Sequence, residues 1–167
     1  MFSILIPTFN NLDYLKICIE SLKKNSKFDH QIIVHVNQGT DGTIEYLKDK
    51  NIEYTYTKEN IGMPKALNLT SKKANFKYIL ISHDDFYYCP GWDVEFKNEI
   101  NLLNHNKFYF SATMVGAGQV QFNAGQTAQS FNETKLINNL ETIKTFDFQG
   151  TTKCPGLVHI DVWKNLG

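Results

Sequence analysis

Two adjacent carboxylates, Asp84 and Asp85, follow the short apolar run at residues 78–81 and precede the turn residues Pro90 and Gly91. A strand that ends in paired acids places them at the carboxyl edge of a sheet, where open α/β folds bind ligands. Two carboxylates at that edge can hold a divalent cation against a phosphate group. The spacing therefore predicts a metal-assisted nucleotide site. The competing interpretation is ordinary loop chemistry, because Asp bonds its own backbone in turns.

Composition limits the classes of protein to which the chain can belong. Its 167 residues are 42% apolar and 20% charged, which is enough for one well-buried core in a single domain spanning 1–167. The 17 basic and 17 acidic residues cancel, so no broad positive field exists to attract nucleic acid or an anionic membrane surface. Any phosphate must be recognised by local contacts.

Cysteine usage and the start of the chain indicate a reducing compartment. Cys18, Cys89 and Cys154 are odd in number and lack Cys-x-x-Cys spacing, which argues against a disulfide framework or a zinc site. The first residues lack the features of a leader peptide, and no stretch is long enough to span a bilayer. We expect a cytoplasmic chain without a transmembrane segment. A peripheral place at the inner face of the membrane stays open.

Strand and helix patterns alternate along the chain. Apolar runs predict strands at 2–6, 31–36, 52–57, 78–81 and 108–115, and helical spacing predicts helices at 12–22, 44–47, 64–73 and 92–103. This alternation predicts an α/β fold, a three-layer sandwich with a central, mostly parallel sheet flanked by helices. Beyond 115 the pattern indicates a long loop at 116–130, one more helix near 136–143, and a short strand at 156–160.

Three loops should meet at the edge of the sheet that carries the acids. Residues 7–11, 37–43 and 83–85 each follow a predicted strand, and the carboxyl ends of parallel strands share one edge. Their small and polar residues allow a base and a ribose to approach the backbone, and the helix N-terminus after Asn10 is available to polar groups. Each loop alone is also consistent with plain turn chemistry, so the prediction depends on their convergence.

Four motifs in this order resemble those of family 2 glycosyltransferases. They are S-I-L-I-P-T-F-N at 3–10, V-N-Q-G-T-D-G-T at 36–43, N-I-G at 60–62 with Ala66 and Asn68, and H-D-D at 83–85 with P-G-W at 90–92. The resemblance covers almost the whole chain. It implies the Rossmann-like GT-A fold, a nucleotide-diphosphate-sugar donor, above all a UDP-sugar, and a Mn²⁺ or Mg²⁺ ion. It also implies inverting transfer to a carbohydrate or other hydroxyl acceptor, in cell-surface polysaccharide biosynthesis.

The resemblance assigns roles to individual residues. Asp85 matches the metal-binding acid, and Asp84 matches the acid beside it that approaches the ribose or the metal. The nucleotide-binding residues that it implies are Pro7, Thr8, Phe9, Asn10, Asn37, Gly62, Lys65 and Asp84. Residues 1–115 would then form the nucleotide-sugar-binding half, and 116–167 would form a partial acceptor-side segment.

The chain departs from the family pattern in its second and third motifs. The 37–43 loop is one residue shorter than the usual D-D-G-S-x-D-G-T and lacks its first acids. Asn37 would therefore accept the imide N–H of a base without a charge, which leaves the identity of the base open. Leu67 stands where an Arg commonly follows the Ala, so Lys65 is the nearby basic residue, either as a diphosphate contact or as a solvent-facing side chain.

None of the four motifs contains the general base that an inverting transfer needs. In the family it lies beyond the stretch matched by 163–167, so the sequence predicts donor binding with poor transfer. Asp147 and Asp161 are weak candidates within the chain, because helix-cap or surface roles explain them equally well.

The sequence thus leaves three functions open. The leading one is a metal-dependent glycosyltransferase of the hexosyltransferase type. The second is a module that binds the donor but is catalytically incomplete. The third is a nucleotidyltransferase, which would also pair carboxylates with a metal but normally has a glycine-rich, basic phosphate loop after its first strand, a feature that 7–10 lack.

Overall fold

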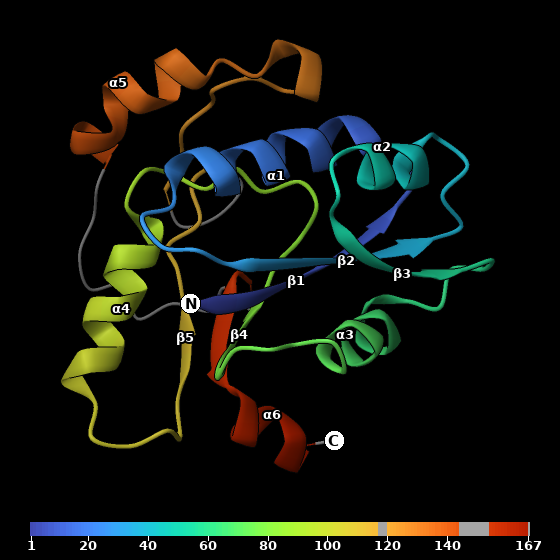
Figure 1. Ribbon diagram of the computed structural model, residues 1–167. Coiled ribbons are helices and arrows are strands. Elements are labelled where there is room, and N and C mark those ends of the chain that lie inside the picture. The colour runs from blue at the N-terminus through green and yellow to red at the C-terminus, as the bar shows by residue number, and fades with distance from the viewer. Residues whose placement is uncertain (117–119, 144–153, 167) are drawn as a thin grey trace.

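A six-stranded mixed sheet forms the centre of the computed structural model, which describes residues 1–116, 120–143 and 154–166 (Figure 1). The strands are β1 (Phe2–Phe9), β2 (Gln31–Asn37), β3 (Glu53–Thr57), β4 (Tyr78–Ile81), β5 (Tyr109–Ser111) and β6 (Gly156–His159), in the order β3-β2-β1-β4-β6-β5. β1 pairs in parallel with β2 and β4, and β2 pairs in parallel with β3. β6 alone runs against its neighbours β4 and β5. The predicted mostly parallel sheet is confirmed.

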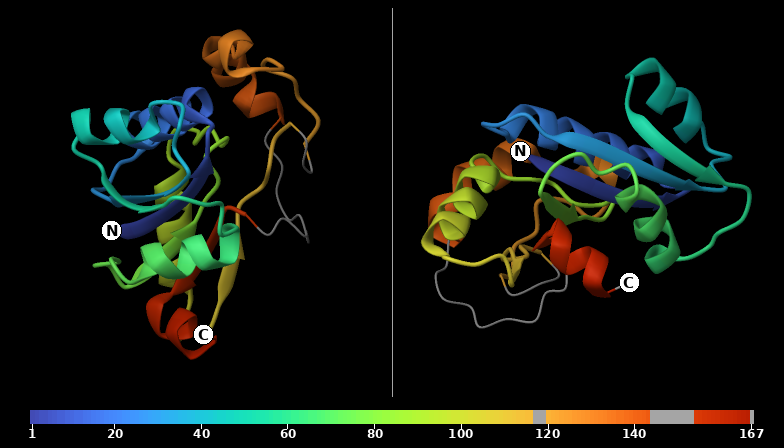
Figure 2. Two further views of the ribbon diagram at one scale, coloured as in Figure 1. Left: turned by 90° about the vertical axis from the view of Figure 1, so that its right-hand side faces the viewer. Right: turned by 60° about the horizontal axis from the view of Figure 1, so that its bottom comes forward.

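Helices cover both faces of this sheet. They are α1 (Leu12–Asn25), α2 (Thr43–Asp49), α3 (Met63–Ser71), α4 (Trp92–Leu102), α5 (Glu133–Ile143) and α6 (Ile160–Leu166), with a 3₁₀ turn η1 (Ala128–Ser130). Figures 1 and 2 show α1 and α2 on one side of the first three strands and α3 on the other, with α5 outermost beyond α1. The three-layer arrangement expected from the sequence is therefore present. None of the described helices has the length and apolar character needed to cross a bilayer.

Alternate side chains of the strands supply two apolar cores. On the face of α1, the fully buried Ile4 and Ile6 of β1 join Leu15 and Ile19 of the helix. Leu15 and Ile19 are four residues apart, close to the 3.6 residues of one helical turn, so they lie on one face of α1. Burying each such side chain contributes about 1.5–3 kcal/mol. On the opposite face, Leu5 packs with residues of β2, β4, β6 and α3. The two cores hold the strand ends, and hence the loops that follow them, in place.

Two strands differ in length from the predictions. β1 continues through Pro7, Thr8 and Phe9, which lie in register with β2 rather than in the predicted turn. Proline is tolerated there because β4 pairs with β1 only as far as Leu5, so the missing N–H faces a stretch without a ladder. The strand predicted at 108–115 is limited to β5, because its paired partner β6 offers only three residues in register.

The last described strand joins the two halves predicted from the sequence. β6 comes from the 116–167 stretch, yet it lies between β4 and β5. Its antiparallel register places Gly156 beside Ile81 at the carboxyl end of β4, and His159 beside Tyr78 at the other end. The proposed donor and acceptor portions thus share one sheet.

Candidate functional site

The paired acids lie at the carboxyl edge of the sheet, in the loop that follows β4. β1 and β2 end at the same edge, with Phe9 paired to Asn37, and β3 ends there with Thr57. The backbone N–H of Ser82 continues the ladder by donating to Leu5. The structure thus brings the three predicted loops together around the carboxylates, because all four strands run in the same direction.

Asp84 is held by the end of β1. Thr8 Oγ1 donates a hydrogen bond of 2.6 Å to Asp84 Oδ2. Partial burial, together with the charge of Asp85, raises the pKa of Asp84, while the polar side chains of Thr8 and Asn11 oppose that increase. Asp84 therefore has one fixed orientation, with part of its hydrogen-bonding capacity already used.

Asp85 differs from its neighbour in exposure. It is exposed and makes no hydrogen bond or ion pair with any residue in the described ranges. Within those ranges, no three His, Cys, Asp or Glu side chains gather where they could enclose a metal ion. One open carboxylate beside a braced one fits a hard cation that keeps waters and takes its remaining ligands from phosphate oxygens. The donor set does not fit a metal caged by protein alone.

The loop that carries Asp85 is anchored beneath it by α1. The buried thiol of Cys18 donates to the carbonyl of His83 at 3.4 Å, and burial strongly raises the pKa of this thiol. The His83 ring packs against the Phe86 ring in a tilted arrangement, with ring centroids 5.2 Å apart. These contacts make Cys18 a neutral packing residue under the site rather than a reactive thiol.

Asn37 has both ends of its amide engaged within the protein. Its Nδ2 donates to the carbonyl of Thr8 at 3.2 Å, and its Oδ1 accepts from the backbone N–H of Ile61 at 2.9 Å. Only 3% of the residue is exposed. The amide oxygen expected to meet a base instead accepts from Ile61, and the two bonds of the amide together tie the end of β1 to the loop before α3. Asn37 therefore braces the predicted pocket, and its geometry does not favour contact with a base.

The first two loops are joined by two further side chains. Asn10 Oδ1 accepts from the backbone N–H of Thr40 at 2.8 Å. Asp41 accepts from Leu12 N at 2.9 Å through one oxygen and from the backbone and hydroxyl of Thr43 through the other. Burial acts to raise the pKa of Asp41, but these hydrogen bonds outweigh it and the pKa is lowered. The ionised carboxylate thus caps α1 and α2 at once.

Gln38 is a candidate that the sequence analysis did not single out. It follows β2 directly, is exposed, and adopts a left-handed backbone with φ of 68°, while its N–H donates to the carbonyl of Thr57. A non-glycine residue in this region is uncommon and is concentrated at functional sites. Phe9, 48% exposed, ends the neighbouring strand. In the sequence, the signal for this position is the N-Q-G turn, and a turn pattern does not show that the amide of Gln38 is exposed.

The remaining predicted residues lie on the α3 side or away from the site. Gly62, with φ of 76°, precedes α3, and Lys65 is exposed in its first turn, near the ends of β2 and β3. Asp161 follows β6 at the opposite edge of the sheet, where its side chain is 69% exposed and lies 3.4 Å from His159 Nδ1. The structure does not bring Asp161 to the carboxylate pair, because β6 runs against β4. Asp147 falls outside the described residues.

The sequence matches a family model that agrees with this geometry. Residues 3–154 match the model described as Glycosyl transferase family 2. The chain therefore belongs to glycosyl transferase family 2.

Among its relatives are uncharacterized glycosyltransferases of rickettsiae. The one from Rickettsia bellii (strain RML369-C) is 32% identical over 117 residues, which are 66% of this chain and 16% of the relative. The one from Rickettsia prowazekii (strain Madrid E) is 38% identical over 106 residues, covering 61% of this chain and 31% of the relative. The chain thus spans less than a third of the length of these relatives.

Solved structures share the fold at low sequence identity. S. aureus TarS 1–349, in complex with UDP-GlcNAc, gives a TM-score of 0.70 at 17% identity and covers 99% of this chain and 47% of that one. The mannosyltransferase PcManGT from Pyrobaculum calidifontis, in complex with GDP-Man and Mn²⁺, gives a TM-score of 0.56 at 17% identity over 67% of this chain and 35% of that one. The chain has the GT-A fold of these glycosyltransferases.

Proposed function

We propose that this chain carries the donor site of an inverting, metal-dependent glycosyltransferase that uses a nucleotide-diphosphate sugar. The observation that supports it best is the pair of unlike carboxylates at the carboxyl edge, Asp84 braced by Thr8 and Asp85 open to solvent. Such a pair suits a diphosphate that arrives with its own cation. A UDP-sugar is the first donor to test, since TarS was solved with UDP-GlcNAc.

Asp85, assisted by Asp84, would hold the Mn²⁺ or Mg²⁺ ion. When bound, such an ion neutralises charge on the diphosphate as it leaves. PcManGT, solved with Mn²⁺, has the same fold. Asp84 keeps its orientation through the hydrogen bond from Thr8, so little reorganisation of this side chain would be needed when the donor binds.

The nucleoside would lie along the ends of β1 and β2. Phe9 offers an exposed aromatic face, and Gln38 offers an amide that can both donate to and accept from a base edge. Asn10 and Asn37 would hold the surrounding loops in place. Gly62 and Lys65, at the start of α3, would border the phosphates.

The acceptor, a carbohydrate or other hydroxyl compound, would approach from the stretch after β5. β5 ends at Ser111, which is in register with Gly156 and through it with Ile81, so this stretch begins at the site edge. A hollow of about 470 Å³ opens farther along, lined by Gly116, Gln121, Phe122, Asn123 and Gly125. An aromatic ring among amides suits a hydroxyl-rich, uncharged ligand.

A donor-binding module without transfer activity is the second candidate. An inverting transfer needs a carboxylate near the acceptor hydroxyl to take its proton. Asp161, one of the two candidates for this carboxylate, lies at the far edge of the sheet from Asp84 and Asp85. This observation favours binding without transfer for the described part of the chain.

A panel of nucleotides tests both candidates. Thermal stability should increase with UDP in the presence of Mn²⁺ more than with GDP, CDP or TDP, because a ligand stabilises the state that it binds. Metal-dependent release of UDP from UDP-sugars, with and without oligosaccharide acceptors, then separates a transferase from a binding module. If no nucleotide stabilises the protein with Mn²⁺ or Mg²⁺, the proposed function is wrong.

A further inference from the structure

Tyr87 joins two parts of the chain that lie far apart in sequence. It is two residues beyond Asp85, and its hydroxyl donates a 2.6 Å hydrogen bond to Glu133 Oε1 at the start of α5. The same hydroxyl oxygen accepts from Asn25 Nδ2 at 3.0 Å. The Phe131 ring packs against the Tyr87 ring, with centroids 5.0 Å apart. One side chain thus contacts the loop of the carboxylates, the end of α1 and the approach to α5.

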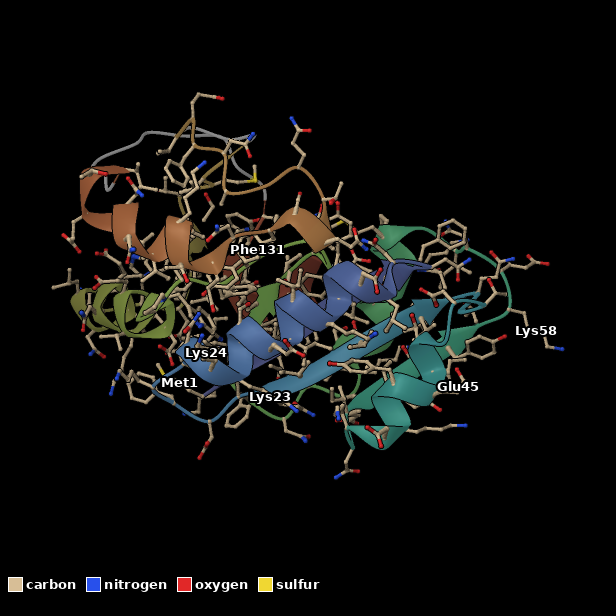
Figure 3. All side chains as sticks on the ribbon, turned by 90° about the horizontal axis from the view of Figure 1, so that it is seen from above. Met1, Lys23, Lys24, Glu45, Lys58 and Phe131 are labelled. Carbon is tan, nitrogen blue, oxygen red and sulfur yellow. The ribbon has the colours of Figure 1, made fainter. Side chains whose placement is uncertain are left out.

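The acid in this cluster is held in its charged form. Lys24 Nζ lies 2.8 Å from both carboxylate oxygens of Glu133, and the hydrogen bonds from Lys24 and Tyr87 lower the pKa of Glu133. Burial and the Glu133 contact raise the pKa of Tyr87, so its hydroxyl keeps its proton. Figure 3, which labels Lys24 and Phe131, shows the chain entering α5 beside α1. The contact is therefore a charge-assisted hydrogen bond, which is stronger than a neutral one.

The neighbouring residue anchors the same loop to α1. The backbone N–H of Tyr88 donates to Ser21 Oγ, its carbonyl accepts from Asn25 Nδ2, and its hydroxyl donates to Ser82 Oγ. Asp84 is bonded on the other side of Asp85. Asp85 thus lies between Asp84 and Tyr88, which are both anchored, and Tyr87 adds a contact from the same loop to the 131–133 segment.

We propose that Tyr87 is a positioning residue through which docking of 131–133 on α1 sets the place of Asp85, so that donor affinity depends on the acceptor-side segment. The proposal rests on the proposed donor site. If 131–133 were not docked, the 83–88 loop would lose one of the contacts that order it. The loop would then have to become ordered when the ligand binds, which would weaken the apparent affinity for the cation and nucleotide together. An acceptor that displaces 131–133 would then loosen the hold on the donor, since coupling between sites is reciprocal.

The test uses variants that remove either partner of the hydrogen bond between Tyr87 and Glu133. Tyr87→Phe keeps the ring against Phe131 but removes the hydroxyl, and Glu133→Ala removes the acceptor. Each should raise the Mn²⁺ concentration that half-saturates UDP binding about fivefold, the effect of one hydrogen bond. Each should also speed backbone hydrogen exchange at 83–88. Glu133→Gln, which keeps an oxygen for the Tyr87 hydroxyl, should fall nearer to the wild type.

Controls separate positioning from general loss of stability. Glu141→Ala changes an exposed acid on the same helix and should leave both measurements unaltered. The double variant of Tyr87→Phe and Glu133→Ala should lose less than the sum of the two single effects, because both single variants remove the bond between Tyr87 and Glu133. If the single variants lower the melting temperature yet leave hydrogen exchange at 83–88 and Mn²⁺ half-saturation as in the wild type, the proposal is overturned. A wild type that binds no UDP would refute the proposed donor site, while the exchange measurement would still decide whether Glu133 orders the loop.

Discussion

Thr8 Oγ1 donates to Asp84 Oδ2 at 2.6 Å, across 76 positions of sequence. The buried hydroxyl at the end of β1 thereby orients the first acid of the pair, while the side chain of Asp85 stays open to solvent. The first two predictions follow from this difference between the adjacent carboxylates.

Replacing the Thr8 hydroxyl should weaken both the fold and the site. Thr8→Val keeps the shape but leaves the Asp84 carboxylate without one of its donors, which costs about 2 kcal/mol when the acceptor is charged. We expect a lower free energy of unfolding in denaturant titrations and weaker Mn²⁺-dependent UDP binding by calorimetry. Thr8→Ser, which retains a donor, is the matched control. Equal behaviour of the Val and Ser variants would contradict the assigned role.

The two acids should respond differently to neutralisation. Asp85→Asn removes the charge of the open ligand and should abolish Mn²⁺-dependent nucleotide binding, whereas Asp84→Asn should only weaken it. Calorimetry with UDP, with and without Mn²⁺, measures both. Asp49→Asn, at an exposed acid paired with Lys50, should behave as the wild type. Unchanged affinity in Asp85→Asn would rule out its role as a metal ligand.

A negative charge at position 37 should lower the stability of the fold and should not strengthen nucleotide binding. From sequence alone, Asn37→Asp would tighten uracil binding by replacing a neutral acceptor with a charged one. In the structure the new carboxylate would lose the donor to Thr8 and face its carbonyl oxygen, so we expect a loss of about 1–3 kcal/mol in unfolding free energy and no gain in UDP affinity.

Gln38 gives the contrast to that experiment. Gln38→Asn tolerates the same left-handed backbone but shortens the reach of the amide, so it should weaken UDP binding with little change in stability. If Asn37→Asp bound UDP more tightly than the wild type, Asn37 rather than Gln38 would be the residue that contacts the base.

Removing Asp41 should uncap two helices at once. Asp41→Ala leaves Leu12 N and Thr43 N without their acceptor, and each lost cap costs about 1 kcal/mol. A decrease on the order of 2 kcal/mol in denaturant titration is expected from these two caps. Asp49→Ala serves as the surface control. A decrease no larger than that of the control would show that water replaces the carboxylate at both helix ends.

Acid should destabilise the fold through a buried pair away from the site. His30 Nε2 lies 3.0 Å from Asp93 Oδ2, and burial lowers the pKa of His30. Burial acts to raise the pKa of Asp93, but hydrogen bonds from His30 and from two backbone amides outweigh it and the pKa is lowered. For both groups the unfolded chain binds more protons at low pH, so stability increases with pH.

The pH window follows from these directions. The His30 contribution is complete above its unfolded pKa of about 6.5 and is lost as pH falls toward the lower folded value, and the Asp93 contribution is lost below about 3.9. Denaturant titrations at pH 7.5 and 5.5 should show a smaller difference for His30→Gln than for the wild type. Equal differences would mean that other groups carry the acid sensitivity.

The sequence alone was sufficient for the layout of the sheet edge. Local periodicity placed β2, β3 and β4 and the amphipathic face of α1, because burial on one face imposes a repeat of two or 3.6 residues. It also put Asp84 and Asp85 at the carboxyl edge, since an apolar run that ends in acids has one favourable position in an α/β sheet. The order of the four motifs added the family.

Tertiary structure decided which polar groups are still available. The sequence placed Asn37 near a base, but the fold engages its amide with Thr8 and Ile61, and it engages Tyr87 with Glu133. The fold also places Asp161 far from Asp84 and Asp85, because β6 runs against β4. Strand direction and hydrogen bonds between distant positions depend on how the whole chain packs, and a local pattern carries no record of them.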